Sequence, residues 1–276
     1  MPELPEVEAI ARTLRPLVEG REIERCRVIH PIAAAGISGK GKKAAAKRLE
    51  AKLRGRLIQG VERRGKYLAL ALDRGKAVMH FKFDGQLIWF DGKEISGHVD
   101  VALEMEHGAL GFVDPRHLGR VHWVESLDEV RGLRAMGMEP LGGEFTAAHL
   151  GERLQGCRRA VKLFLLDQSK IAGIGNIYSS EALWRARLAP QRMASGLDEA
   201  ETKRLHKGIV GVLGSALKCC LHPAPNFRDA NWWFQGLERI LRVYGREGKT
   251  CRRCGHRIER MEQGGRGTYW CPGCQE

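Results

Sequence analysis

The 276-residue chain has no uninterrupted apolar segment near 18 residues, so the sequence predicts no membrane-spanning helix. Its start also lacks the basic-then-apolar order of a signal peptide, because Glu3 and Glu6 stand among the first residues. These two absences predict a soluble, cytoplasmic protein with no membrane partner.

Acidic residues are the scarcer charged class. Lys and Arg number 46 against 33 Asp and Glu, which gives a net charge of +13. Basic residues outnumber acidic ones by eleven to two in residues 39–66 and by nine to four in residues 239–276. A solvated face explains a single run of this kind as readily as a binding site does, but two runs flanking other motifs favour a nucleic-acid partner.

Regularly spaced cysteines are also few, so a disulfide framework is not predicted. Four of the eight cysteines form the pattern C-x2-C-x16-C-x2-C: Cys251, Cys254, Cys271 and Cys274. Two close pairs of thiolates match the tetrahedral ligand set of one structural Zn²⁺, with no open position for catalysis. A redox pair is the alternative, but no thioredoxin-like βαβ context surrounds it. The remaining thiols are expected to be buried or incidental: Cys26, Cys157, Cys219 and Cys220.

The segment between the two cysteine pairs predicts a β-hairpin. It reads RIERMEQGGRGTYW, with Gly264 and Gly265 at the tip and Arg266 just beyond it. An arginine at a zinc-held turn is well placed to contact phosphate, and a merely solvated arginine is the alternative.

A glycine-rich loop lacks the features of a dinucleotide site, since no third glycine follows and no βαβ unit surrounds it. Gly173, Gly175 and Asn176 instead run directly into a predicted helix. Backbone N–H groups at a helix N-terminus bind phosphate well. The loop and its two flanking helices therefore predict a clamp on a nucleic-acid backbone.

Hydrophobic periodicity divides the chain into a β-rich and an α-rich half. After a first helix ending near residues 19–20, period-two alternation predicts six strands at 67–72, 77–83, 86–90, 98–105, 109–114 and 120–125. Helical periodicity then predicts helices at 146–155, 158–167, 176–188 and 198–220, most of them preceded by a Ser, Thr, Asp or Asn cap. The predicted fold class is α+β, with an antiparallel β-sandwich or barrel first. The predicted domains are 2–132, a linker at 133–144, 145–238 and 239–276.

The opening PELPEVE places a proline at position 2. The plain explanation is a proline at the first turn of a helix, followed by glutamates that favour a helix N-terminus. The alternative is chemical, because removal of Met1 leaves Pro2 with a free secondary amine. An α-amino group has a pKa of about 7.7–8.0, against about 10.4 for lysine, so a useful fraction is nucleophilic near neutral pH. Such an amine attacks a carbonyl-like carbon and forms an iminium.

Six motifs, in order along the chain, resemble those of formamidopyrimidine-DNA glycosylase. They are PELPEVE, RRGKYL (63–68), DPR (114–116), LLDQSKIAGIGNIY (165–178), VYGREG (243–248) and GGRGTYWCPGCQ (264–275). The resemblance implies a β-sandwich with an N-terminal helix, a helix-two-turn-helix domain and a zinc-finger hairpin. It implies base-excision repair by a nucleoid-associated, bacterial-type monomer that binds double-stranded DNA carrying damaged bases or abasic sites. Such an enzyme removes oxidised or ring-opened purines and then cleaves the abasic site by β- and δ-elimination.

The resemblance also assigns catalytic roles. Pro2 attacks C1′ of the damaged nucleotide, Glu3 is the acid that assists opening of the sugar ring, and Glu6 is a supporting carboxylate. Lys66 contacts phosphate and assists proton transfer. Arg266 binds phosphate and takes part in the later elimination. The damaged base must leave the stack before C1′ is accessible, which fits a base-flipping enzyme.

The residues assigned to DNA contact are Phe83, His98, Arg116, Leu118, Lys162 and Asn176. Two of the motifs depart from the family pattern, since HFKFDG replaces H-L-x-M-S-G and DPRHLG replaces DPRRFG. Phe83, Arg116 and Leu118 still suit the filling of the void that a flipped base leaves.

Residues 217–235 depart most from the family, because they replace the loop associated with 8-oxoguanine. Within them Trp232 and Trp233 are expected either in the core or stacked on bases. Two other functions stay open, an endonuclease VIII-like glycosylase for oxidised pyrimidines and a non-catalytic damaged-DNA-binding protein. The opening PELPE favours the purine enzyme over the first, whose usual opening is PEGPE. Pro2, Glu3 and Lys66 disfavour the second.

Overall fold

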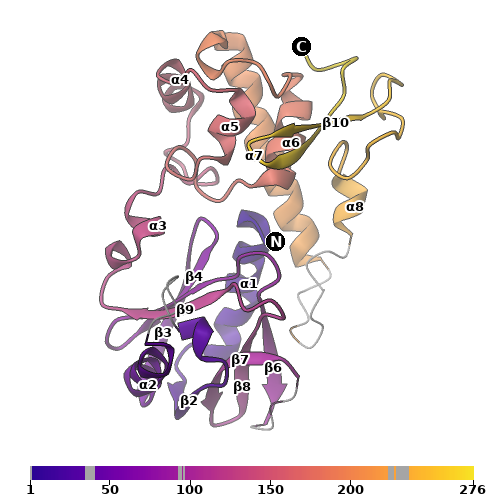
Figure 1. Ribbon diagram of the computed structural model, residues 1–276. Coiled ribbons are helices and arrows are strands. Elements are labelled where there is room, and N and C mark those ends of the chain that lie inside the picture. The colour runs from indigo at the N-terminus through magenta and orange to yellow at the C-terminus, as the bar shows by residue number, and fades with distance from the viewer. Residues whose placement is uncertain (1, 35–40, 93–94, 96, 223–226, 228–235) are drawn as a thin grey trace. The chain divides into compact units, whose positions relative to one another are not determined.

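The computed structural model describes residues 2–34, 41–92, 95, 97–222, 227 and 236–276 (Figure 1). The chain divides into two compact units. Unit 1 comprises residues 1–2, 6–134 and 220–235, and unit 2 comprises residues 3–5, 135–219 and 236–276. The start of the chain therefore contributes to both units. Trp232 and Trp233 lie outside the described residues, as do residues 39–40 of the basic run.

Unit 1 is built on two antiparallel sheets. The first sheet has the order β1-β3-β4-β5-β9 and is formed by Glu22–Ile23, Arg56–Arg64, Tyr67–Leu72, Lys76–His80 and Arg120–Val124. The second has the order β2-β7-β8-β6 and is formed by Arg25–Val28, Val99–Met105, Gly108–Val113 and Gln86–Asp91. The aromatic rings of Phe81 and Phe112 stack within this unit, with their centroids 5.9 Å apart. The predicted β-sandwich is confirmed.

The six strands expected from the sequence are β4 to β9. One of them is shorter than predicted, because β5 ends at His80 and not at residue 83. Lys82 there adopts a left-handed backbone conformation, with φ of 55°, which ends the pairing. Strands β1, β2 and β3 were not predicted. The alternation in β3 is masked by its five charged or amide side chains, of which Gln59 and Glu62 are exposed and three arginines are half-buried.

The helices of unit 1 surround these sheets. They are α1 (Leu4–Val18), η1 (Pro31–Ala34), α2 (Lys42–Leu53), η2 (Leu127–Glu129) and α3 (Arg131–Arg134). Helix α1 begins after Pro2, and its apolar residues Val7, Ile10 and Leu14 are fully buried. Helix α2 buries only three of its residues and exposes its lysines, as the sequence predicts for this basic segment.

Unit 2 is helical apart from its hairpin. Its helices are α4 (Ala147–Gln155), α5 (Val161–Leu166), α6 (Asn176–Ala186), η3 (Ala194–Gly196), α7 (Glu199–Leu221) and α8 (Leu237–Ile240). Two predicted caps are present, because the Thr146 hydroxyl accepts the His149 N–H and the Asp198 carboxylate accepts the Glu201 N–H. Helices α5 and α6 have no such cap, since Ala160 and Gly175 precede them.

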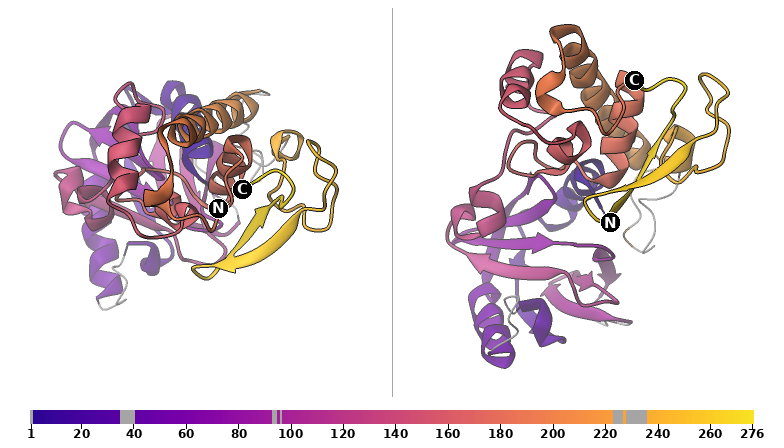
Figure 2. Two further views of the ribbon diagram at one scale, coloured as in Figure 1. Left: turned by 90° about the horizontal axis from the view of Figure 1, so that it is seen from above. Right: turned by 45° about the horizontal axis from the view of Figure 1, so that its top comes forward.

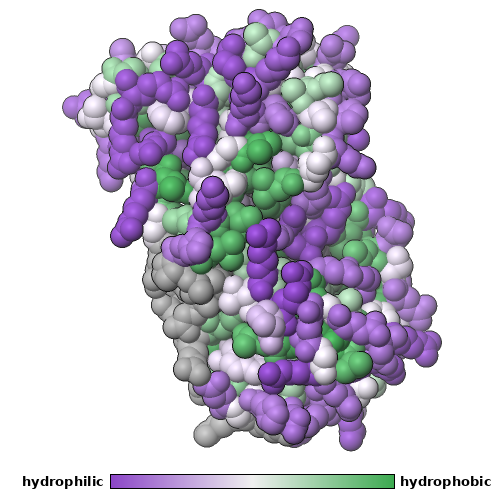
Figure 3. Space-filling view, turned by 180° about the vertical axis from the view of Figure 1, so that it is seen from behind, coloured by the Kyte–Doolittle hydropathy of each residue, from purple (hydrophilic) through white to green (hydrophobic). Residues whose placement is uncertain are grey.

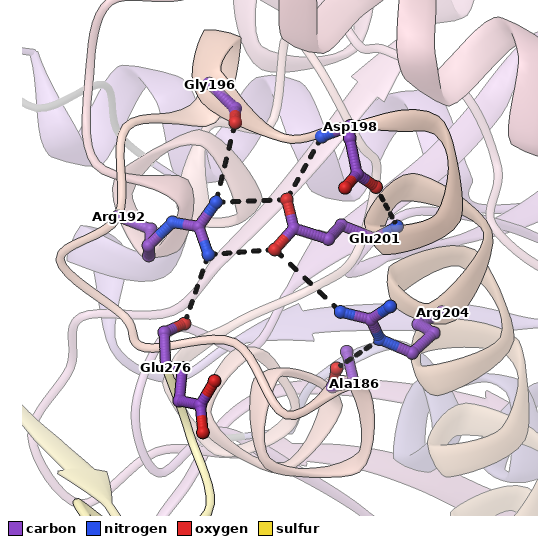
Figure 4. A network of polar contacts seen from close by, with 7 residues as sticks. All are labelled: Ala186, Arg192, Gly196, Asp198, Glu201, Arg204 and Glu276. Atoms are coloured by element: carbon purple, nitrogen blue, oxygen red, sulfur yellow. Dashed lines mark hydrogen bonds and ion pairs between the residues drawn. The ribbon is translucent and has the colours of Figure 1, made fainter.

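The start of α7 is fixed by a polar network (Figure 4). Both guanidinium Nη atoms of Arg192 donate to the Glu201 carboxylate, at 2.8 and 3.0 Å. Glu201 also accepts the Asp198 N–H at 3.0 Å, which completes a reciprocal capping box. The Glu276 carbonyl accepts a further hydrogen bond from Arg192, at 3.4 Å, so the same arginine holds the end of the chain.

A two-stranded hairpin follows the helices, with β10 (Glu259–Gln263) paired to β11 (Arg266–Trp270). It runs beside the helices of unit 2 (Figure 2). Gly264 and Gly265 form its two-residue turn, with φ of 57° and 71°. Two successive positive φ values are what the preferred hairpin turns require, which explains the glycine pair.

The surface seen in Figure 3 is covered largely by hydrophilic side chains, with apolar side chains gathered in smaller patches. Within the described residues, none of the helices has both the length and the apolar character needed to cross a bilayer.

Candidate functional site

The carboxylate of Glu3 is held at the N-terminus of helix α6. One oxygen accepts the Gly175 N–H at 2.7 Å and the Tyr178 N–H at 3.4 Å, and the other accepts the Ile177 N–H at 2.9 Å. These are the orphan donors of the first helical turn, and the helix dipole favours an anion there. Glu3 therefore supplies the cap that α6 lacks locally. Glu3 therefore occupies these N–H groups, and the clamp on a nucleic-acid backbone that the sequence predicts for this loop stays a prediction for its other groups.

A glycine brings the first residues to the helix. Gly173 has φ of 78°, and a Cβ there would lie 2.7 Å from the Cβ of Leu4. Its carbonyl accepts the Leu4 N–H at 3.1 Å. A larger residue at position 173 would displace Leu4 and with it the adjoining Glu3.

Two cations of unit 2 lie near one another, and one of them, Lys162, also lies near the Glu3 carboxylate. Lys162 is fully buried, and its ammonium donates to the Ser180 hydroxyl at 2.7 Å. Burial lowers the pKa of Lys162 to about 7, the Glu3 carboxylate opposes this shift and the Arg266 guanidinium adds to it. Arg266 itself is exposed at the tip of the hairpin. Lys162, which the sequence assigns to phosphate contact, is thus a buried ammonium on which the Glu3 anion and the exposed Arg266 cation act in opposite directions.

Asn176, the first residue of α6, ties that helix to the hairpin. Its side-chain amide donates to the Gly267 carbonyl at 2.9 Å. Gly267 follows Arg266, so the same contact fixes the base of the arginine that the sequence assigns to phosphate binding.

A buried carboxylate that the sequence did not single out holds the segment after α8. Glu181 is completely buried and accepts the backbone N–H groups of Arg242, Val243 and Tyr244 at 2.8 to 2.9 Å. Burial raises the pKa of Glu181, while these three hydrogen bonds lower it. The first residues of the VYGREG motif are thereby anchored to helix α6.

Unit 1 holds the other residues assigned to catalysis. Pro2 and Glu6 are buried, and Glu6 lies 4.0 Å from the Cys220 sulfur. Lys66 is half-buried in the turn that precedes β4. Its charge is close enough to His80 to lower the pKa of that histidine.

Two loops of unit 1 present the residues expected to fill the void of a flipped base. Phe83 and Leu118 are 51% and 39% exposed, which is high for large apolar side chains. The Arg116 guanidinium lies over the Phe83 ring, 4.9 Å from its centroid, and forms an ion pair with Asp84. Phe83, Arg116 and Leu118, here called the wedge residues, thus project from neighbouring loops. His98, also assigned to DNA contact, is exposed.

Residues that the sequence analysis did not single out hold the loop of Phe83. His80 Nδ1 accepts the Lys82 N–H at 3.0 Å and so stabilises the left-handed residue before Phe83. Burial and the nearby charges of Lys82 and Lys66 lower the pKa of His80 to about 3. The imidazole is therefore neutral and remains an acceptor throughout the neutral pH range.

The loop of Arg116 and Leu118 is held by the fully buried Asp114. Its carboxylate accepts the backbone N–H groups of Arg116 at 3.0 Å and Leu118 at 2.8 Å, and that of Gly119 as well. The motif DPR contained this residue, but only the fold reveals that its role is to shape the loop.

The four spaced cysteines come together around one point. Their sulfurs lie within 4.8 Å of one another, with 3.9 Å between Cys251 and Cys274 and 3.3 Å between Cys254 and Cys271. A tetrahedral Zn²⁺ with Zn–S bonds of about 2.3 Å separates its sulfurs by about 3.8 Å, so the donor set fits one zinc ion. The Arg253 N–H also points to the Cys251 sulfur at 3.5 Å, the kind of contact that stabilises a thiolate.

We expect one zinc ion per chain and loss of that ion in Cys251→Ser. Cys251 and Cys271 are buried with Trp184, Val243 and Ile258, so the hairpin should come away from α6 without the metal. If Arg266 contacts phosphate as the sequence predicts, its displacement should weaken binding to duplex DNA by about 10- to 100-fold. Metal analysis and binding titrations test this, and Cys157→Ser, a buried cysteine outside the cluster, is the matched control. A native protein without zinc would contradict the assignment.

Three family models match the chain. Residues 1–121 match the formamidopyrimidine-DNA glycosylase N-terminal domain, residues 136–221 match the H2TH domain of the same enzyme, and residues 248–276 match the zinc finger found in FPG and IleRS. The third match covers the four cysteines and the hairpin, and supports zinc as the resident metal.

Full-length relatives agree with the family models. The formamidopyrimidine-DNA glycosylase of Desulfitobacterium hafniense is 38% identical over 279 residues, covering all of both chains. The Lactococcus lactis Fpg in complex with abasic-site DNA superimposes with a TM-score of 0.88 at 28% identity, covering 99% of each chain. A Lactococcus lactis Fpg mutant bound to Fapy-dG-containing DNA gives 0.87 at 29% identity over all of both chains. The chain belongs to the formamidopyrimidine-DNA glycosylase family.

Proposed function

We propose that this protein removes oxidised or ring-opened purines from double-stranded DNA and cleaves the resulting abasic site through a Schiff base on Pro2. The family is one of base-excision repair glycosylases with abasic-site lyase activity. This membership favours the proposal over a pyrimidine-directed glycosylase and over a non-catalytic binding protein. We expect the protein to act as a monomer in the nucleoid, where its DNA substrate lies.

The assignment of the catalytic residues rests on the position of Glu3, whose carboxylate is hydrogen-bonded to the N-terminus of helix α6. Three backbone N–H groups fix a carboxylate on the residue that follows Pro2. An acid placed next to a nucleophilic amine is what opening of the sugar ring requires, because the ring oxygen needs a proton as the amine attacks C1′. The peptide bond between Pro2 and Glu3 keeps the two groups adjacent in any arrangement of the units.

The reaction then follows from the iminium. The C1′–N iminium makes the C2′ proton acidic, so a base removes that proton and the 3′ phosphate leaves. A second elimination releases the 5′ phosphate. We assign Glu6 as a supporting carboxylate and Lys66 and Arg266 to the phosphates that carry the leaving groups.

The cations of unit 2 suit a phosphate backbone. Arg266 is exposed at the hairpin turn and has no hydrogen bond or ion pair from its side chain among the described residues, so its charge is available to a ligand. Lys162 is buried, so we propose that its ammonium sets the charge around Glu3 and reaches phosphate only after a local rearrangement. Asn176 holds the hairpin and adds an amide near the same surface.

We expect the affinity for an abasic-site duplex to fall steeply as salt increases, and Arg266→Ala to lower the log–log slope by about one unit. Each lost phosphate contact removes one counterion-release contribution. Titrations at several salt concentrations measure the slope. Arg257→Ala, an exposed arginine that donates to the Gly248 carbonyl, is the matched control with an unchanged slope. An unchanged slope in Arg266→Ala would mean that this arginine is only solvated.

The proposed lesion class is tested with a panel of duplexes, each carrying one defined lesion. We expect excision of ring-opened formamidopyrimidines, cleavage at abasic sites, and weaker activity on 8-oxoguanine. The reason is the departure at 217–235 from the family loop associated with 8-oxoguanine, a segment that lies mostly outside the described residues. Excision of 8-oxoguanine as fast as that of ring-opened purines would contradict the expected preference. Absence of all excision would contradict the proposed function.

A further inference from the structure

Three polar side chains, those of His30, Asp100 and His117, gather where the loop of Arg116 and Leu118 meets strand β7. His117 Nδ1 lies 2.8 Å from an Asp100 carboxylate oxygen, and the His30 ring stacks on the His117 ring with 3.7 Å between centroids and 12° between planes. Asp100 is on β7 and is only 1% exposed. His30 precedes η1, and its backbone N–H donates to the Asp100 carbonyl at 3.0 Å.

His117 stands between two wedge residues in a strained conformation. Its φ is 53°, a left-handed conformation that is unfavourable for a residue with a Cβ and persists only where the surroundings enforce it. Two kinds of contact enforce it here. Its backbone N–H donates to the Asp114 carbonyl at 2.9 Å, and its carbonyl accepts a hydrogen bond from Arg120, also at 2.9 Å. Its side chain is held by Asp100 and His30.

The cluster does not suit a metal ion as it stands, although it contains two histidines and a carboxylate. A metal ion lies close to the plane of each imidazole that binds it, and two nearly parallel stacked rings share no such point. His117 Nδ1 also already interacts with Asp100. Burial raises the pKa of Asp100, and the His117 and His30 rings oppose that shift. The geometry is that of an Asp100–His117 pair in which the carboxylate orients the imidazole and the His30 ring stacks against it.

We propose that Asp100 and His30 are positioning residues for base excision, acting through His117 to hold the loop that presents Arg116 and Leu118. This inference rests on the proposed function, since it concerns the insertion of those residues into DNA. Because β7 is buried along its whole length, the pair ties an exposed loop to a rigid strand. The left-handed residue then turns its two neighbours outward, where a flipped base leaves its void.

Single-turnover excision measures the effect on chemistry. Asp100→Ala should lower the excision rate by about 10- to 100-fold, because a displacement near 1 Å of a group that orients substrate has effects of that size. Affinity for undamaged duplex should stay within about threefold, since phosphate contacts dominate it. Asp100→Asn, which keeps an oxygen acceptor for the imidazole, should recover most of the rate.

Two controls separate positioning from general destabilisation. Val78→Ala truncates a fully packed residue of β5 and should leave the excision rate close to that of the unchanged protein. The fluorescence of 2-aminopurine opposite the lesion reports unstacking of the duplex. Its rise should slow in Asp100→Ala and not in Val78→Ala. If the excision rate fell in proportion to the fall in melting temperature in both variants, the inference would be overturned.

A double-mutant cycle with Leu118→Ala decides whether Asp100 acts through the loop. If it does, Leu118→Ala/Asp100→Ala should excise no more slowly than the slower single variant. If the double variant were slowed by the product of the two single effects on the excision rate, the positioning role of Asp100 would be overturned and the proposed function would stand. If Leu118→Ala excised at the unchanged rate, the wedge assignment itself would fail. A second zinc ion per chain that is lost in Asp100→Asn would overturn the inference in favour of a metal site.

Discussion

Protein that keeps Met1, or that carries any N-terminal tag, is expected to lose both base excision and abasic-site cleavage. In either case the Pro2 nitrogen is part of an amide, whose lone pair is delocalised into the carbonyl and does not attack carbon. A lysine with its ordinary pKa of about 10.4 is protonated at neutral pH and does not replace this amine. Lys162, whose pKa burial lowers to about 7, is fully buried and donates to the Ser180 hydroxyl, so we expect no replacement from it either. Strand-cleavage assays on an abasic duplex and on a damaged duplex measure both activities.

The matched control uses the same tag with a cleavage site that leaves Pro2 as the first residue. Removal of the tag should restore both activities to the level of the untagged protein. Binding to an abasic-site duplex and the zinc content should be similar before and after removal, since the tag leaves the hairpin unchanged. Full cleavage activity with the tag in place would contradict the role of Pro2.

Glu3→Gln should abolish base excision and keep much of the abasic-site cleavage. Removal of a base needs an acid to assist ring opening, whereas at an abasic site the base is already gone and the sugar opens unaided. The lyase reaction therefore depends on the amine far more than on the carboxylate. Parallel rate measurements on a formamidopyrimidine duplex and on an abasic duplex separate the two steps.

The structure predicts that Glu3→Gln also lowers the stability of the fold. A glutamine offers one acceptor oxygen to the α6 N-terminus, while its NH₂ group faces an N–H donor, so the cap should weaken by about 1–2 kcal/mol. A fall in melting temperature of about 2–8 °C is expected. Glu19→Gln, which alters a carboxylate that accepts the Val61 N–H, is the control for stability and should excise normally. Equal loss of both activities in Glu3→Gln would contradict the separation of steps.

Features set by local sequence were predicted well. Helix α1, the strands β4 to β9 and helix α7 with its Asp198 cap follow from periodicity and capping rules, which act within a few residues. The zinc ligands were predictable for the same reason, because two C-x2-C pairs bring their thiolates together through short turns. The family resemblance was carried by motifs of this local kind, and the family is confirmed.

Features that join distant parts of the chain were not predicted. The cap of α6 comes from Glu3, 172 residues before Gly175, and no pattern near either residue indicates it. The Asp100–His117 pair joins a strand to a loop, and a carboxylate within the alternating segment 98–105 looked like any polar strand residue. Strand β5 ended early because His80 accepts the Lys82 N–H, a contact that depends on burial of the imidazole.

The central claim is that the nitrogen of Pro2 becomes covalently bound to C1′ of the damaged nucleotide. Borohydride added during turnover reduces the iminium to a stable amine and traps a protein–DNA adduct. Peptide mapping by mass spectrometry then locates the modified residue. We predict one adduct per chain, on the N-terminal peptide at residue 2. An adduct at Lys66, Lys162 or another lysine would contradict the account.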